Sequence, residues 1–262
     1  MEVHHSHHHG HKKKWNELLL EFFMLFAAVS LGFLAENIRE GQIEDHRAKE
    51  FLELFTNEVK INNKLIDSVM KQNKPMLVGN ERILYGLLNN DKNLSMSKLA
   101  DTLNMYTYRF SNDKRIFDQM KNSGALRYIK DKNLIDKITA YEIEADLAEF
   151  RAFDQETSQW KDAFKFICEN MPGAFMLKMF INKRMTLING QNPEIFQLYD
   201  MSKDEIERKL AKSSLSESTK DKLINYLALR TDLQKLSMAN YIRVEKKGNQ
   251  LIEDLEDYIN KH

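Results

Sequence analysis

The densest group of side chains that could bind a metal lies at the N-terminus, where six of the eight histidines fall within residues 4–11. Neutral imidazoles bind zinc, nickel and copper, so one interpretation is a metal-sensing or metal-buffering tail. The alternative is a disordered polar leader whose metal binding is weak and incidental. We favour the alternative because no carboxylate or thiolate lies among these histidines. The candidate ligands are His4, His5, His7, His8, His9 and His11.

A single carboxylate, Glu21, interrupts the apolar run from Leu18 to Ala35. A charge within such a run is costly in a membrane and usually faces a partner or a water-filled cavity. Heptad steps from Glu21 lead to the small residues Ala28 and Gly32, which allow another helix to approach closely. The pattern predicts a helix-association face. The alternative is that Glu21 lies one turn inside the membrane, where it reaches water. The face consists of Glu21, Leu25, Ala28, Gly32 and Ala35.

The rest of the chain lacks residue patterns typical of catalysis. No phosphate-binding glycine loop, zinc-protease motif or serine-hydrolase motif occurs, and only two histidines lie outside the N-terminal group. An acidic group on a predicted helix lacks the ExxH pair that a carboxylate metal site would need, so we predict a solvated face. The single cysteine, Cys168, is expected to be a small buried side chain. We therefore expect no enzyme activity and no cofactor. The acidic residues are Glu142, Glu144, Asp146 and Glu149.

Composition favours long helices over a β architecture. The 262 residues contain three prolines and nine glycines, whereas turn-rich β proteins need many of both. Lys plus Arg equals Asp plus Glu at 39 each, so no net charge attracts nucleic acid. The predicted fold is all-α: one N-terminal transmembrane helix that continues into a long stalk helix, followed by an irregular bundle of long and short helices.

The apolar segment 18–35 is long enough to cross a bilayer, since 18 helical residues rise about 27 Å. Three lysines at 12–14 precede it, while Arg39 is the one basic residue just beyond it. The positive-inside rule then places the N-terminus in the cytoplasm. Two alternatives remain: a signal peptide cleaved at Ala28-Val29-Ser30, or a buried core helix of a soluble protein.

The predicted organisation has three parts: a disordered His/Lys-rich cytoplasmic tail (1–14), a transmembrane helix (15–36) and a helical extracytoplasmic domain (37–262). Beyond the membrane segment, apolar residues and asparagines alternate by three and four, which indicates a stalk with a heptad seam. The seam could pair with a second copy, with Asn62 fixing the register. It could also pack on later helices of the same chain, and we favour this because those helices need a partner face. The seam consists of Leu52, Phe55, Val59, Asn62, Ile66 and Val69.

Local signals predict where the other helices begin and end. Pro75 is expected to begin a new segment, since proline disfavours the interior of a helix. Gly248 is expected to interrupt the last helix. The remaining signals are capping side chains, a glycine suited to a left-handed conformation and a Pro-Gly pair. They fall at Gly124, Asp131, Pro172-Gly173, Ser202, and Ser216 or Ser218.

Two stretches carry a resemblance to a known family. The first is HHGHKKKWNELLLEFFMLFAAVSLGFLAENIRE with HRAKEFLELFTNEV, and the second is FDQMKNSGALRYIKDKNLIDKI. Together they resemble an uncharacterised family of bacterial single-pass membrane proteins with a His-rich leader, an N-terminal anchor helix and an all-helical extracytoplasmic domain. The resemblance covers the first 60 residues best and the C-terminal third least. It implies an anchor in the bacterial inner (cytoplasmic) membrane and no particular activity.

These observations favour a membrane-anchored helical scaffold or interaction protein that associates through helix faces. Its expected partners are the membrane and either another membrane protein or a second copy of itself, with no role for nucleic acid. The alternative is a ligand-sensing or signal-relay module with a small molecule bound in a pocket between helices.

Overall fold

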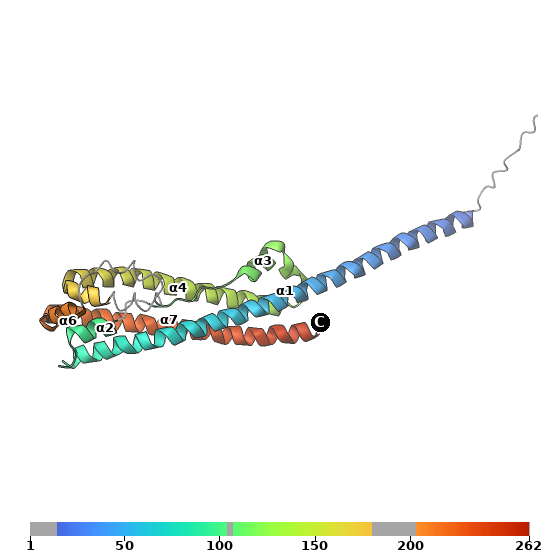
Figure 1. Ribbon diagram of the computed structural model, residues 1–262. Coiled ribbons are helices and arrows are strands. Elements are labelled where there is room, and N and C mark those ends of the chain that lie inside the picture. The colour runs from blue at the N-terminus through green and yellow to red at the C-terminus, as the bar shows by residue number, and fades with distance from the viewer. Residues whose placement is uncertain (1–14, 104–106, 180–202, 262) are drawn as a thin grey trace, which may run out of the picture.

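The computed structural model describes residues 15–103, 107–179 and 203–261, and all regular structure within them is helical (Figure 1). The predicted all-α fold is confirmed. Three helices are long and the others are short. The elements are α1 (Trp15–Leu88), α2 (Met96–Thr102), α3 (Arg115–Ser123), the 3-10 helix η1 (Ala125–Tyr128), α4 (Lys132–Asn170), a short helix at 173–179, α6 (Lys203–Ala211) and α7 (Glu217–Lys261).

Helix α1 joins the apolar N-terminal segment to the bundle without a break over 74 residues. Its first part extends alone, and its second part packs beside α7 (Figure 1). The prediction that Pro75 begins a new segment is wrong, because the helix runs through it. Pro75 removes one backbone donor on an exposed face, whereas Asn73, Asn80 and Ile83 stay buried on the opposite face. Packing on both sides of the proline therefore outweighs the local cost.

The three long helices form an elongated bundle in which α7 runs antiparallel to both α1 and α4. Lys60 Nζ of α1 lies 2.6 Å from Glu256 of α7. Further along α1, Glu81 lies 2.5 Å from Lys235 Nζ, which comes earlier in α7 than Glu256, so the two helices run in opposite directions. On the other flank of α7, Lys247 Nζ lies 2.9 Å from Glu144 of α4. Since α7 opposes both partners, α1 and α4 run in the same direction.

The heptad seam of α1 is buried inside this bundle. Each of its six residues is less than a tenth exposed, and its apolar members belong to one hydrophobic cluster with residues of α4 and α7. In this structure the seam packs on helices of its own chain. The buried seam residues are Leu52, Phe55, Val59, Asn62, Ile66 and Val69.

Gly248 does not interrupt α7, contrary to the prediction from sequence, since the helix continues to Lys261. The glycine is instead a point of close approach between helices. A Cβ atom placed there would lie 2.5 Å from Oδ1 of Asn63 on α1. The Asn63 amide is buried and donates to Asn249 Oδ1 at 2.9 Å, so it has little room to move.

Several predicted boundaries are confirmed. Gly124 ends α3 with a φ of 72°, in the left-handed region that favours glycine. Asp131 caps α4 by accepting from the backbone N–H groups of Asn133 and Leu134. Helix α4 ends at Asn170, just before the predicted Pro-Gly stop, and Ser216 Oγ accepts from Thr219 N at the start of α7. The predicted cap at Ser202 lies outside the described residues.

The close approach at Gly248 leads to a stability prediction. Gly248→Ala should lower the free energy of unfolding by about 1–3 kcal/mol, because the new methyl group displaces the Asn63 amide from its hydrogen bond. Thermal unfolding of the full chain in detergent, followed by circular dichroism, measures this.

Gly41→Ala is the matched control, since a Cβ there meets nothing within 4 Å and alanine favours helix. It should be neutral or slightly stabilising. Equal losses in the two variants would contradict a specific α1–α7 contact at Gly248.

Candidate functional site

The apolar N-terminal part of α1 is not buried by the rest of the described chain. Its most apolar 18 residues have a mean hydropathy of 2.3, and none of them is buried. Among the described helices, α1 alone is long and apolar enough to cross a membrane. The predicted association face lies on one side of this segment, because its members are three or four residues apart. It remains a prediction for Glu21, Leu25, Ala28, Gly32 and Ala35.

Two asparagines on the bundle part of α1 hold the segment 107–114, which has no regular structure. The Asn62 side chain donates to Asp113 O at 2.9 Å and accepts from Asp113 N at 3.0 Å. Asn73 makes the same pair of bonds with Tyr108, each 2.8 Å long. Each amide thus satisfies both backbone groups of one residue. We call these two contacts the asparagine clamps.

The spacing of the clamps matches the two kinds of backbone that they join. Eleven residues of α1 separate Asn62 from Asn73, a rise of about 16 Å in a helix. Five residues separate Tyr108 from Asp113, which also span about 16 Å when extended. Between the clamps, Phe110 enters the core against Tyr241 of α7 and donates its N–H to the Tyr241 hydroxyl at 3.3 Å. The segment is therefore attached to α1 and α7 along its length.

The segment connects α1 to a buried carboxylate on α4. Asn112 accepts from Asn62 at 2.9 Å and donates to both Glu142 and Asp146 at 3.0 Å. Its backbone N–H donates to Glu149 at 2.9 Å. We call Asn62, Asn112, Glu142, Asp146 and Glu149 the polar joint, because they join three parts of the chain by hydrogen bonds.

The prediction that the acidic residues of α4 form a solvated face is wrong for Glu142, which is 3% exposed. Burial, together with the nearby Glu58 and Asp146 carboxylates, raises the pKa of Glu142 to about 8, although Asn112 and Lys114 oppose the shift. Its Oε1 atom has no hydrogen-bond partner among the described residues. Glu142 therefore holds a proton near neutral pH.

A second buried carboxylate, Glu58 of α1, accepts from the backbone N–H groups of Ile116 and Phe117 at 2.6 and 3.1 Å. Helix α3 has no capping side chain of its own, so Glu58 supplies the cap from a distant part of the chain. Burial raises the pKa of Glu58, and the two backbone donors oppose the shift. Local sequence could not reveal this cap, because nearly sixty residues separate donor and acceptor.

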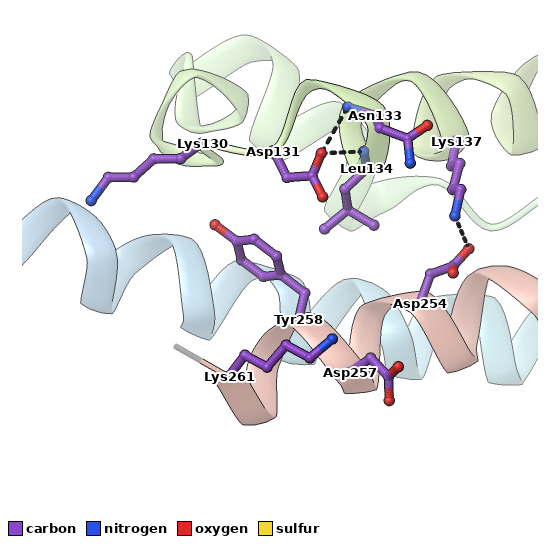
Figure 2. A pocket seen from close by; sticks show the side chains of 9 residues that line it. All are labelled: Lys130, Asp131, Asn133, Leu134, Lys137, Asp254, Asp257, Tyr258 and Lys261. Carbon is purple, nitrogen blue, oxygen red and sulfur yellow. Dashed lines mark hydrogen bonds and ion pairs between the residues drawn. The ribbon is translucent and has the colours of Figure 1, made fainter.

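A surface pocket of about 440 Å³ lies between the start of α4 and the end of α7 (Figure 2). Four of the six charged residues that line it, Lys130, Asp131, Lys137 and Asp254, make hydrogen bonds or ion pairs. Asp131 caps α4, Lys137 pairs with Asp254 at 2.7 Å, and Lys130 pairs with Asp45 of α1. The ligand-sensing hypothesis stays a prediction.

Other predicted chemical groups fall in different places. Cys168 is exposed on α4, so the prediction of a buried thiol is wrong. Within the ranges that the structure describes, no three His, Cys, Asp or Glu side chains are placed to hold a metal ion. The six histidines proposed as ligands, at positions 4, 5, 7, 8, 9 and 11, lie outside those ranges.

Comparisons with known proteins give no match to this chain: no family model, no curated protein and no solved structure is significantly similar to it. The functional argument therefore depends on the geometry of the molecule alone.

The buried proton on Glu142 predicts that stability depends on pH. The folded state holds this proton more tightly than the unfolded chain, whose carboxyl titrates near 4.5. The stabilisation is thus complete below that pH and is lost as the pH rises through 8, by an amount of the order of a few kcal/mol. Glu142→Gln, a neutral amide, should remove most of this decline in melts between pH 5 and 9.

Glu144→Gln on the same helix is the control. Hydrogen bonding to Lys247 lowers the pKa of Glu144, so its contribution is present at neutral and alkaline pH and is lost in acid. That variant should keep the decline in stability between pH 5 and 9. If the decline persists equally in Glu142→Gln, Glu142 does not carry the proton.

Proposed function

We propose that this protein is a single-pass membrane protein whose N-terminal helix anchors a helical scaffold, and that the scaffold associates with other proteins through helix faces. One observation carries the proposal. A single continuous helix, α1, is exposed and apolar over residues 18–34 and is then buried in the bundle from Ala48 onward.

This change along one helix supports an anchor over the alternatives. A soluble protein rarely exposes so large an apolar surface, and a core helix would be covered by its own chain. Cleavage after Ser30 would leave Leu31, Phe33 and Leu34 exposed on the mature protein, each more than half exposed here. A bilayer covers all of these side chains at once.

The proposed orientation follows from charge. Lysines at 12–14 precede the apolar segment and only Arg39 follows closely, so the tail is cytoplasmic and the bundle extracytoplasmic. In a bacterium this orientation would place the protein in the inner membrane. The anchor also offers the association face around Glu21, to which another membrane protein or a second copy could bind.

Topology is the first test. A C-terminal epitope should remain with membranes washed in alkali, and protease added to spheroplasts should remove it. A protected epitope would reverse the orientation. Release of a shortened chain by alkali would show a cleaved signal peptide and would remove the basis of the anchor.

The association face is tested separately. Gly32→Leu should weaken association in a membrane two-hybrid assay by about tenfold or more, because a large side chain prevents close approach of helices. Glu21→Leu should also weaken it by removing the polar contact. Ala27→Leu adds comparable bulk on a different side of the helix and should have little effect. Association that survives both changes on the face would exclude this face.

A further inference from the structure

Helix α4 carries large apolar side chains on the side that faces solvent. Five of them are between 38% and 65% exposed and recur at spacings of three, four and seven residues. Arg109 lies over the Phe153 ring at 4.8 Å but leaves that ring more than half exposed. We call these residues the α4 stripe. They are Ile143, Leu147, Phe150, Phe153 and Trp160.

The middle of α4, from 143 to 160, is reversed relative to an ordinary amphipathic helix. There, alanines at 145, 148 and 152 lie on the buried side and the larger apolar side chains of the stripe lie on the exposed side, whereas the buried side nearer the ends of α4 carries Leu134, Ile138, Tyr141 and Ile167. A surface helix normally places its largest apolar residues in the core and polar residues outside. The reversal indicates that a further partner covers the outer side.

The position of the α4 stripe limits what that partner can be. Gly248 adjoins Asn63 of α1, and the neighbouring Lys247 pairs with Glu144, so the start of the stripe is level with Asn63. Asn63 lies about 40 Å along α1 from Ala35, at the end of the apolar segment. The stripe continues for about 25 Å further from the membrane. A bilayer cannot reach it, so the partner is a protein that extends to the same height.

A second copy of this chain satisfies that requirement without further assumptions. Two copies anchored in one membrane point the same way and present their stripes at equal heights. Spacings of three, four and seven residues keep the stripe on one side of α4, so two stripes can lie against each other along two parallel helices. We propose that two copies pair side by side through the α4 stripe. This inference rests on the proposed anchor, which fixes both height and direction.

The area of the stripe suits pairing within a membrane. Half-exposed side chains of this size bury about 100 Å² each, so two stripes would bury about 1,000 Å² together. That is near the lower limit for a specific interface between soluble proteins. Anchoring both copies in one membrane raises their effective concentration, so an interface of this size can be occupied there.

Pairing through α4 keeps the two anchors apart. Each α4 would lie between the other copy and the rest of its own bundle, where α4 packs on α7 and reaches α1 through the polar joint; packed helices are about 8–10 Å apart. The two α1 helices would then be separated by roughly 25–30 Å. The association face around Glu21 would therefore contact some other helix, not the anchor of the same partner copy. The two surfaces can be tested independently.

The chain carries its own probe for this pairing. Cys168 is exposed and lies 18 residues, or about five turns, beyond Phe150, on the same side of α4. In a parallel pair the two thiols face each other. A short bismaleimide should link the full-length protein in its membrane into a dimer through Cys168, and Cys168→Ser should abolish the link.

Phe150→Glu should reduce the linked fraction by about tenfold or more, since pairing would bury two opposed carboxylates. Leu229→Glu, at a comparably exposed leucine of α7, is the control and should link like the wild type. Glu21→Leu should also link normally. Melting curves of the variants should match, because all of these positions lie outside the core.

Normal linking by Phe150→Glu would overturn the proposal. If a monofunctional maleimide modifies Cys168 in the wild type but the bismaleimide does not link it, the proposal is overturned as well. Failure of both reagents to react at Cys168 would overturn it too, because the side of α4 that carries the stripe would then be covered in another way. Alkaline extraction of the same membranes shows separately whether the anchor holds, so its failure is distinguishable from failure of the pairing.

Discussion

The asparagine clamps are the contacts on which the arrangement of the bundle depends. A segment without regular structure has backbone donors and acceptors that must be satisfied when it is buried between helices. Asn62 and Asn73 each satisfy the backbone N–H and C=O of one residue in this segment. Eleven residues of helix and five residues of extended chain cover the same length, so both clamps can form at the same time. Phe110 can then enter the core, and Asn112 can reach the carboxylates of α4.

The polar joint extends this constraint to α4. Asn112 uses its carbonyl toward α1 and its amide toward Glu142 and Asp146, so one side chain fixes the distance between two long helices. A buried network of this kind contributes specificity when its members are satisfied. Glu142 accepts from Asn112 through Oε2, while its Oε1 has no hydrogen-bond partner among the described residues; burial disfavours the charged carboxylate and so raises its pKa.

Much of the fold could be predicted because it depends on local or periodic signals. The all-helical content, the Asp131 cap and the left-handed Gly124 each follow from residues within a few positions. Two wrong predictions share a cause. Intrinsic helix propensity predicts a break at Gly248 and at Pro75, whereas packing of α1 against α7 keeps both positions helical. Glu142 seemed solvated in a charged run, since its partner Asn112 is thirty residues away in the chain.

The continuity of α1 gives the molecule its functional geometry. Between Ala35 and the first buried residue, Ala48, the chain contains no proline and no loop, and Gly41 stays helical. Because α1 is one continuous helix, the bundle is joined to the apolar segment without a loop (Figure 1). With the proposed anchor in a membrane, every surface of the bundle would lie at a set distance from that membrane. Under that proposal, geometry alone would exclude an anchored partner whose surface lies at another height.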